Sequence, residues 1–367
     1  MKKKIFTFCL ALMLSVGTMF AEKVKIGDLY YNLDASVQIA EVTYQNYDSE
    51  TNYSGLSTIF IPDSVEYNSM AYNVISIGDY AFYKCSSLTS VEFPNNVKKI
   101  GTRAFAYCTS LTNVEIPATV SEIGKYAFTW CSSLATIEVA KDNLNYSSIS
   151  GVMFDKEQKI LLQYPGGKQG VYIVPNQVTH IGDDAFLWCT NLTSVEIPIS
   201  VTNIGWDAFD GCVGLTSIIC KALTPPACES YVFYHVDENI PLYVPLESVN
   251  AYKSAAEWMQ FKNIIAILDV NVNYWKSEGN KLNSETVTLH LPVAPKISGF
   301  TFDRWDVQAG TLNDGINIQA VYRADDPTSA PAFYTNPFNP AQKLIRNGNV
   351  YILTDDRTYT LTGHEVK

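Results

Sequence analysis

The chain has 367 residues and a formal net charge of -11, and 47% of its residues are hydrophobic while 17% are charged. This composition is too apolar for a disordered chain and too low in charge for a coiled coil, so it predicts a folded protein with a large core. The length predicts two or three domains, unless an internal repeat extends one of them. The acidic balance argues against nucleic acid and against an anionic membrane as the main partner.

Residues 1–21 have the pattern of a secretory signal peptide. Three lysines precede an uncharged apolar stretch over residues 5–20, and Ala21 offers a small residue for cleavage. Gly17 and Thr18 are alternative positions for the cut. The apolar stretch is shorter than the roughly 20 residues that a transmembrane helix needs, and no later segment comes close. We therefore expect an exported protein, at the cell surface or extracellular, with no transmembrane segment.

Residues 22–73 are rich in strand-forming residues. Tyr30-Tyr31 and the stretches 37–42 and 59–61 combine aromatic and β-branched side chains. They predict several β-strands ahead of the first clear repeat.

Over residues 74–268 one motif recurs with a spacing of 23 residues. Five copies carry Ile-Gly, then Ala-Phe, then Cys, followed by Leu-x-x-Val-x-Ile-Pro, as over residues 100–117. A second column of residues marks the end of each unit, at Ile61, Phe93, Ile116, Val139, Val174, Ile197, Cys220 and Val244. These eight positions predict about eight coils of one solenoid.

Each coil is predicted to contain two short strands and one helical turn. The alternating apolar residues of Leu-x-x-Val-x-Ile predict a half-buried strand that ends at Pro, and Val-x-x-Ile-Gly predicts a second extended piece. Ala-Phe-x-x-Cys places Phe and Cys on one face of a helical turn. No coil buries its apolar face alone, so the coils must stack on a shared core. The longer stretch between Val139 and Val174 predicts a hairpin, around residues 151–154 and 160–165, that bulges from the stack.

These residues resemble the BspA-like leucine-rich repeats of Bacteroides-type bacterial surface proteins. The recurring unit there is the same Ile-Gly-x-x-Ala-Phe-x-x-Cys-x-x-Leu-x-x-Val-x-Ile-Pro, and the match covers about residues 57–268. The resemblance implies an α/β repeat solenoid, a right-handed coil of short parallel strands and single helical turns. It also implies a secreted or outer-surface protein that adheres to host matrix proteins and to other cells.

The two ends of such a solenoid expose core and open strand edges, so they must be covered. Residues 22–73 are predicted to form an N-terminal β cap. At the other end of the solenoid, over residues 248–261, helical spacing places Trp258 and Phe261 where they can plug the core.

Residues 269–325 predict a small β-domain, because apolar and polar residues alternate in three stretches. Its Gly-Phe-Thr-Phe-Asp-Arg-Trp over residues 299–305 resembles a turn of the Listeria-Bacteroides repeat. Four prolines mark residues 326–341 as a stiff linker. Residues 342–367 predict a hairpin tail, which resembles a reduced sorting tail of type IX secretion or is an ordinary terminal hairpin.

Five cysteines recur at one repeat position, namely Cys85, Cys108, Cys131, Cys189 and Cys212. Their register with the buried Phe predicts small core residues, and no His stands beside them at metal-ligand spacing. Cys220 and Cys228 are spaced to form a local disulfide, although Cys220 also falls in the core column. We predict neither a metal nor a cofactor.

No pattern typical of an enzyme is visible in the sequence. The four histidines lie far apart, no Ser or Cys occupies a nucleophile elbow, and Gly166-Gly167 lacks the rest of a phosphate-binding loop. These observations predict a protein without catalytic activity.

Two surface stripes carry the functional signal. The first is the solvent face of the strands, which is either a solvated face that blocks aggregation or a cation-seeking binding face. The second lies on the predicted helical turns, where residues four apart share a face. It pairs Arg103 with Tyr107, Tyr126 with Trp130, and Asp184 with Trp188. Exposed Tyr, Trp and Arg anchor interfaces and sugar platforms, unless they only cover neighbouring turns.

We therefore predict a non-enzymatic adhesion or protein-interaction protein whose partners are host or bacterial surface proteins. The alternatives are a glycan-binding module, in which the aromatic stripe stacks on sugar rings, and a structural spacer. The candidate binding residues are Glu92, Glu115, Glu138, Glu196, Tyr107, Tyr126, Trp130 and Trp188.

Overall fold

The computed structural model describes residues 22–44, 53 and 55–267, followed by a series of strands between residues 268 and 366 for which we describe only the backbone. The signal peptide predicted for residues 1–21 lies outside the described residues, as does most of the predicted linker. The chain divides into two compact units. The N-unit comprises Met1–Glu157 with Tyr164–Lys168, and the C-unit comprises Gln158–Gln163 with Gln169–Lys367.

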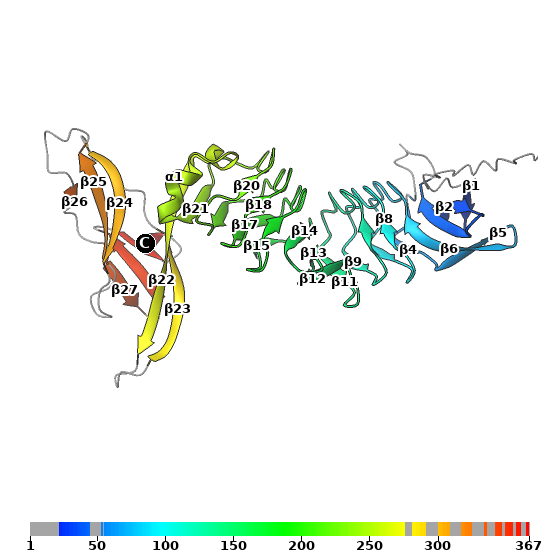
Figure 1. Cartoon of the computed structure of the whole chain (residues 1–367), viewed down its shortest axis with the longest axis horizontal. Helices are drawn as coiled ribbons and strands as arrows, with labels where there is room; N and C mark the ends of the chain where they lie inside the picture. Colours follow the sequence, from blue (N-terminus) through cyan, green and yellow to red (C-terminus); the bar gives the residue numbers. More distant parts are fainter. Residues whose placement is uncertain are drawn as a thin grey trace, which may run out of the picture. The chain divides into compact units, whose positions relative to one another are not determined.

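The N-unit begins with an antiparallel meander of β1 (Glu22–Ile26), β2 (Leu29–Asp34) and β3 (Ile39–Thr43). Strand β3 pairs in parallel with β6 (Met70–Ile77), whose own hairpin partner is β5 (Ser64–Tyr67). The sheet continues in parallel through β8 (Lys99–Ile100) and β10 (Glu122–Ile123). The strand-rich segment thus adds the first strands to one side of the repeats (Figure 1).

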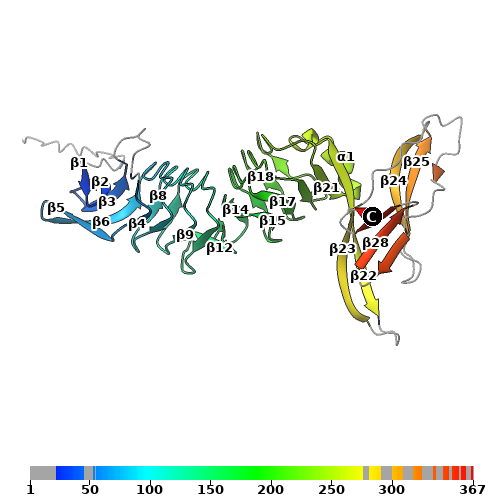
Figure 2. The same ribbon diagram turned by 180° about the vertical axis from the view of Figure 1, so that it is seen from behind.

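A second side of the N-unit is a row of short parallel strands, which we call the N-unit strand row. It consists of β4 (Thr58–Phe60), β7 (Ser90–Glu92), β9 (Asn113–Ile116) and β11 (Thr136–Val139). Each strand ends at or next to one of the eight marks of the repeat register. In the C-unit the marks fall in the same way on β15 (Gly170–Ile173), β17 (Leu192–Ile197), β19 (Ser217–Cys220) and β21 (Pro241–Pro245) (Figure 2). The predicted solenoid of stacked coils is confirmed.

The third side of each coil differs from the prediction, because the Ala-Phe-x-x-Cys segment is a run of β-turns and not a helical turn. The N–H of Tyr80 donates to the Thr102 carbonyl of the next coil at 2.9 Å, whereas the N–H of Ala81 donates back to the Gly78 carbonyl at 3.2 Å. Alternate N–H groups therefore join coils, and the others close turns of four residues. Tyr80 and Lys84 take left-handed φ angles of 57° and 60°, which an α-helix does not contain.

Stacked phenylalanines form the centre of both units. In the N-unit, the ring of Phe105 lies 5.0 Å from that of Phe82 and 5.5 Å from that of Phe128, with interplanar angles of 21° and 12°. In the C-unit, Phe209 lies 4.6 Å from Phe186 and 5.6 Å from Phe233 in the same stacked arrangement. One phenylalanine per coil thus builds a ladder of rings, because equivalent residues of successive coils occupy equivalent places.

The cysteine column lies beside this ladder, and all five members are buried, as predicted. The thiols of Cys108, Cys131 and Cys212 donate to main-chain carbonyls of the preceding coil. Cys108 reaches the Phe82 carbonyl at 3.2 Å, and Cys131 reaches that of Phe105 at 3.1 Å. Burial raises the pKa of the Cys131 thiol to about 12, so the side chain stays neutral at physiological pH.

This burial predicts that stability falls as the pH rises above about 9. In the unfolded chain the thiols ionise at their ordinary pKa, but in the folded chain Cys131 keeps its proton until about pH 12. Between these two pH values, each such thiol lowers the free energy of unfolding by about 1.4 kcal/mol per pH unit. Denaturant unfolding at several pH values should give a shallower decline for Cys131→Ala than for the parent chain. Equal slopes in the two proteins would contradict the thiol's contribution.

The irregular coil does contain the predicted hairpin, formed by β12 (Tyr146–Ile149) and β13 (Val152–Asp155). It does not bulge away from the core, because Val152 and Phe154 are fully buried and Met153 is nearly so. These three consecutive apolar side chains therefore belong to the core.

The second extended pieces of the C-unit also pair in parallel. They are β14 (Ile160–Gln163), β16 (His180–Ile181), β18 (Asn203–Ile204) and β20 (Ala227–Cys228). Cys220 and Cys228 are separate thiols, so the disulfide alternative is not the one seen. Cys220 is buried at the end of β19 and accepts a hydrogen bond from the Tyr252 hydroxyl at 3.1 Å.

The C-unit solenoid is closed by a short helical segment, with turns at Leu246–Ser248 and Trp258–Gln260 and the helix α1 (Val249–Tyr252) between them. Trp258 and Phe261 are buried and pack on the last ring of the ladder, Phe233, as their spacing predicts. The Trp258 indole donates to the Pro226 carbonyl at 2.9 Å, which satisfies its polar group inside the core.

Beyond this cap, β22 (Asn263–Trp275) pairs in parallel with β21 and antiparallel with β23 (Lys281–His290), so it runs through the boundary predicted after residue 268. A three-stranded sheet follows, made of β24 (Phe300–Gln308), β25 (Asn317–Ala324) and β26 (Tyr334–Thr335). The last sheet contains β27 (Gln342–Arg346), β28 (Asn349–Thr354), β29 (Arg357–Thr360) and β30 (Glu365–Val366).

Candidate functional site

The β-turn runs of the N-unit present a layer of aromatic and cationic side chains, which we call the N-unit turn patch. Its members come from three successive coils and are Tyr80, Tyr83, Arg103, Tyr107, Tyr126 and Trp130. Tyr107 and Trp130 occupy the same repeat position, with φ angles of 63° and 60°. The N–H of Tyr107 bonds to the Thr129 carbonyl of the next coil at 3.0 Å, so the main chain of this face is fixed by the stacking.

The rings of this patch contact one another across the coils. Tyr107 and Trp130 are stacked at 4.5 Å with an interplanar angle of 7°, and Tyr83 meets Tyr107 edge-on at 5.6 Å. Tyr126 lies 6.4 Å from Trp130 within the same coil, as predicted from their spacing. Partial burial raises the pKa of Tyr107, so its hydroxyl is a neutral hydrogen-bonding group.

Arg103 joins the two tyrosines of its own repeat column. Its guanidinium lies 5.0 Å from the ring centre of Tyr126 and 5.8 Å from that of Tyr80, distances typical of cation–π contacts. It also donates to the Tyr80 hydroxyl at 3.1 Å. Its ring contacts are therefore with residues 23 positions away on either side, because a β-turn run aligns equivalent positions of neighbouring coils.

Trp188 belongs to the C-unit and is not part of this layer. It is 37% exposed, and its ring lies over Gly211, where an added Cβ would come within 2.5 Å of the indole. Beyond the glycine, the ring is 5.9 Å from His235, which pairs with Asp210 at 2.8 Å. Burial raises the pKa of Asp207 on the same turns, and the carboxylates of Asp210 and Asp183 raise it further.

The glutamate stripe is only partly a continuous surface. Glu92, Glu115 and Glu138 are exposed on the N-unit strand row, and Glu138 stands directly beside Glu115 in the register of β11 and β9. Glu138 accepts a hydrogen bond from the Ser148 hydroxyl at 2.8 Å. Glu196 lies in the C-unit, is half-buried, and pairs with Lys221 at 2.9 Å.

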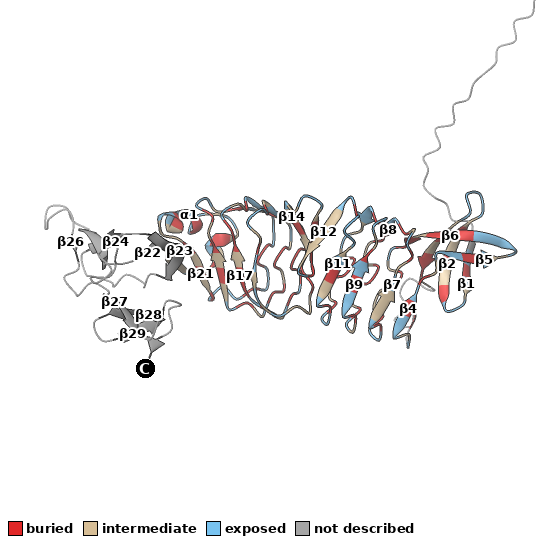
Figure 3. Ribbon diagram, turned by 90° about the horizontal axis from the view of Figure 1, so that it is seen from below, coloured by how far each residue is buried: buried red, intermediate tan, exposed pale blue. Residues whose placement is uncertain are grey.

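Figure 3 shows the strand row with its first strand, β4. A groove lies against this strand. The groove has a volume of about 660 Å³ and is lined by residues that the repeat pattern did not single out, as well as by Glu92 and Glu115. Phe60 lines it and is 66% exposed. The sequence signal for this feature was available, because Phe60 occupies the repeat position that holds Glu in the next three coils.

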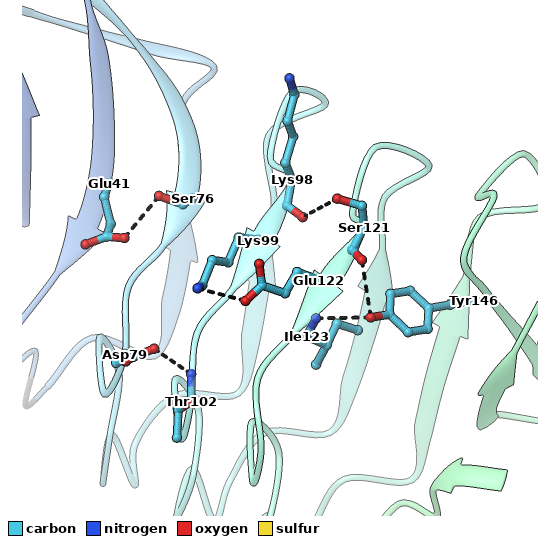
Figure 4. A network of polar contacts seen from close by, with 10 residues as sticks. All are labelled: Glu41, Ser76, Asp79, Lys98, Lys99, Thr102, Ser121, Glu122, Ile123 and Tyr146. Atoms are coloured by element: carbon cyan, nitrogen blue, oxygen red, sulfur yellow. Dashed lines mark hydrogen bonds and ion pairs between the residues drawn. The ribbon is translucent and has the colours of Figure 1, made fainter. Parts of the chain in front are cut away.

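Polar side chains also follow the β6, β8 and β10 side of the N-unit (Figure 4). Lys99 pairs with Glu122 at 2.8 Å, and Ser76 donates to the Glu41 carboxylate at 3.2 Å. The Tyr146 hydroxyl accepts the N–H of Ile123 at 3.1 Å, which satisfies a main-chain group at the end of this row. These contacts join neighbouring coils. Within the described part of the chain, no group of three His, Cys, Asp or Glu side chains is placed to hold a metal ion.

The fold is a repeat solenoid, and the N-unit turn patch forms an aromatic surface on it. A family model for the BspA type leucine-rich repeat region matches residues 52–163 and 170–273, in 6 copies. The match covers more than half of the chain, so the chain belongs to this family. The predicted repeat family is confirmed, whereas the likeness of residues 299–305 to the Listeria-Bacteroides repeat stays a prediction.

Several solved structures are similar to part of this chain. The pneumococcal vaccine antigen PcpA is 15% identical, and the alignment covers 67% of this chain and 98% of that one with a TM-score of 0.37. A leucine-rich cell surface protein from Faecalibacterium prausnitzii is 20% identical over 66% of this chain and 94% of that one, with a TM-score of 0.36. A leucine-rich repeat protein of T. pallidum is 27% identical over 54% and 81%, also with a TM-score of 0.36. A search of curated proteins finds no match.

Among the residues that the structure describes, none forms a helix long and apolar enough to cross a membrane.

Proposed function

We propose that this chain is an exported, non-enzymatic adhesion protein that binds a host extracellular protein through the N-unit turn patch. The observation that carries this proposal is the joined layer of rings and guanidinium over three coils. Tyr, Trp and Arg are the residue types that dominate binding energy at protein interfaces. The resemblance of this chain's repeats to those of bacterial surface proteins supports the exported location.

The contacts inside the patch favour its use in binding. Tyr107 is held against Trp130 at 4.5 Å, and Arg103 is held between Tyr80 and Tyr126. Side chains that are already ordered lose less conformational entropy when a partner docks on them. A flat face built from repeated coils also suits an extended partner better than it encloses a small substrate.

The glutamate stripe supports this role less well. Glu138 and Glu196 already have polar partners in Ser148 and Lys221. A ligand that used these carboxylates would first have to replace those contacts.

Purified residues 22–367 should be tested on an array of extracellular matrix proteins and polysaccharides. For a protein that binds, we expect Trp130→Ala to weaken the affinity about 30-fold, the size expected from losing a central interface anchor of about 2 kcal/mol. Arg103→Ala should act in the same direction. Trp206→Ala, at a C-unit tryptophan that is 50% exposed, should change the affinity less than twofold.

Two results would contradict the proposal. One is matrix-protein binding that Trp130→Ala and Arg103→Ala leave unchanged. The other is binding to polysaccharides alone, lost on Trp130→Ala, which would favour the glycan-binding alternative.

A further inference from the structure

Strand β4 opens the N-unit strand row, and β7 is the one described strand that pairs with it. The Ser57 carbonyl accepts the N–H of Thr89 at 2.7 Å, and the N–H of Ile61 donates to the Glu92 carbonyl at 3.1 Å. Successive main-chain groups of a strand point to opposite edges. The N–H and C=O groups of Thr58 and Phe60 therefore face away from β7, on an edge where the described part of the chain places no further strand.

The groove of about 660 Å³ begins at this strand and extends over the outer face of the strand row, because Glu92 of β7 and Glu115 of β9 line it as well. Thr58 and Phe60 line it, as do Asp28 in the turn between β1 and β2 and Leu29 at the start of β2. Phe60 presents a large apolar surface to solvent beside the unpaired main chain. The site thus offers hydrogen-bonding groups and apolar contact along the same line, which is what an added β-strand requires.

The charged residues described in the lining of the groove are all acidic. Asp28, Glu92 and Glu115 line it, and no Lys or Arg is found among its described lining residues. Glu92 is aligned with Phe60 across the ladder of β7 and β4, so an acidic and an apolar side chain stand next to each other. A second copy of this edge would bring like charges together, and like charges on neighbouring strands are destabilising.

We propose that this groove binds an extended, basic segment of a partner protein, which adds to β4 as a further strand. Main-chain hydrogen bonds to Thr58 and Phe60 hold the segment, the acidic groove attracts its Lys or Arg side chains, and an apolar side chain contacts Phe60. This site is separate from the N-unit turn patch and goes beyond the function proposed for it.

The test uses residues 22–367 and a labelled seven-residue peptide with blocked ends, Lys-Thr-Val-Thr-Lys-Thr-Lys, whose lysines and valine share one face of a strand, followed by fluorescence anisotropy. We expect binding that weakens at least tenfold when glutamate replaces the lysines. A strand that joins an edge uses only alternate amides. N-methylation of one set of alternate amides should therefore weaken binding at least tenfold, and N-methylation of the other set should have little effect.

Protein variants report on the same contacts. Thr58→Pro removes an N–H on the open edge and leaves the bonds of Ser57 and Ile61 to β7 in place, so it should weaken binding at least tenfold. Glu92→Gln with Glu115→Gln should weaken binding and reduce its salt dependence. Trp130→Ala should leave peptide binding unchanged, which separates this site from the N-unit turn patch.

Hydrogen exchange on the parent protein tests the proposal without a variant that might misfold. Bound peptide should slow exchange of the fragment that contains Thr58 and Phe60, and should not slow the fragment that contains Glu138. The proposal is overturned if the fragment shows no protection, if both N-methylated peptides bind equally well, or if the glutamate peptide binds as tightly as the lysine peptide.

Discussion

Phe105→Ala is expected to lower the free energy of unfolding by about 3 to 5 kcal/mol, the usual cost of emptying a buried phenylalanine site. Phe105 is fully buried, and its ring is stacked between those of Phe82 and Phe128. The cavity would lie between two coils, so it also removes ring contacts that join them. Denaturant unfolding followed by circular dichroism measures the loss.

The matched control is Phe60→Ala, which truncates the same side chain where it is 66% exposed. That variant should stay within about 0.5 kcal/mol of the parent, as surface substitutions usually do. A loss of similar size in both variants would show that Phe105 is not part of a stacked core.

Gly124→Ala is expected to destabilise the protein by about 3 kcal/mol, because the coils approach each other too closely for a Cβ at this position. A Cβ on Gly124 would lie 2.4 Å from the main-chain nitrogen of Thr102 and 2.6 Å from the carbonyl carbon of Gly101. Main-chain atoms cannot move aside as a side chain can, so the bond from the Gly124 N–H to the Ile100 carbonyl at 2.8 Å must lengthen.

Gly170→Ala is the control for Gly124→Ala. Gly170 has a φ angle of 87° and nothing within 4 Å of an added Cβ, so only conformational strain of about 1 kcal/mol is expected. If thermal or denaturant unfolding ranks Gly170→Ala as the more harmful change, close coil packing does not explain the repeated Ile-Gly step.

The 23-residue register was enough to predict the strands and the core. The mark residues alternate with polar neighbours, so their strands could be placed to within about one residue, as at Ile116 in β9. The cysteine column could be placed in the core for the same reason, since Cys131 follows Phe128 at the spacing found in every other copy.

The turns could not be predicted from the same pattern. A separation of three residues between Phe and Cys fits one helical turn and also fits a run of β-turns. Left-handed φ angles such as those of Tyr107 and Trp130 are uncommon for residues other than glycine, so nothing in the residue pattern predicts them. The contact of Arg103 with Tyr80 and Tyr126 depends on that backbone.

The groove beside β4 was missed because it is not built from repeats alone. Asp28 lies in the turn of the first hairpin and Leu29 begins its second strand, and only the packed cap brings them near Phe60. Exposed strand edges follow from the order of strands in a sheet, which periodicity does not specify.

The most direct test of the account is the stacking register of neighbouring coils. Glu115 and Glu138 are partners in the ladder of β9 and β11, whereas Glu115 and Thr136 are offset by two residues. In a Cys228→Ser background, a thiol-specific crosslinker that spans about 5 Å matches the separation of directly paired strand residues. The account predicts that Glu115→Cys with Glu138→Cys is crosslinked at least ten times faster than Glu115→Cys with Thr136→Cys. Equal rates, or a faster reaction of the offset pair, would contradict it.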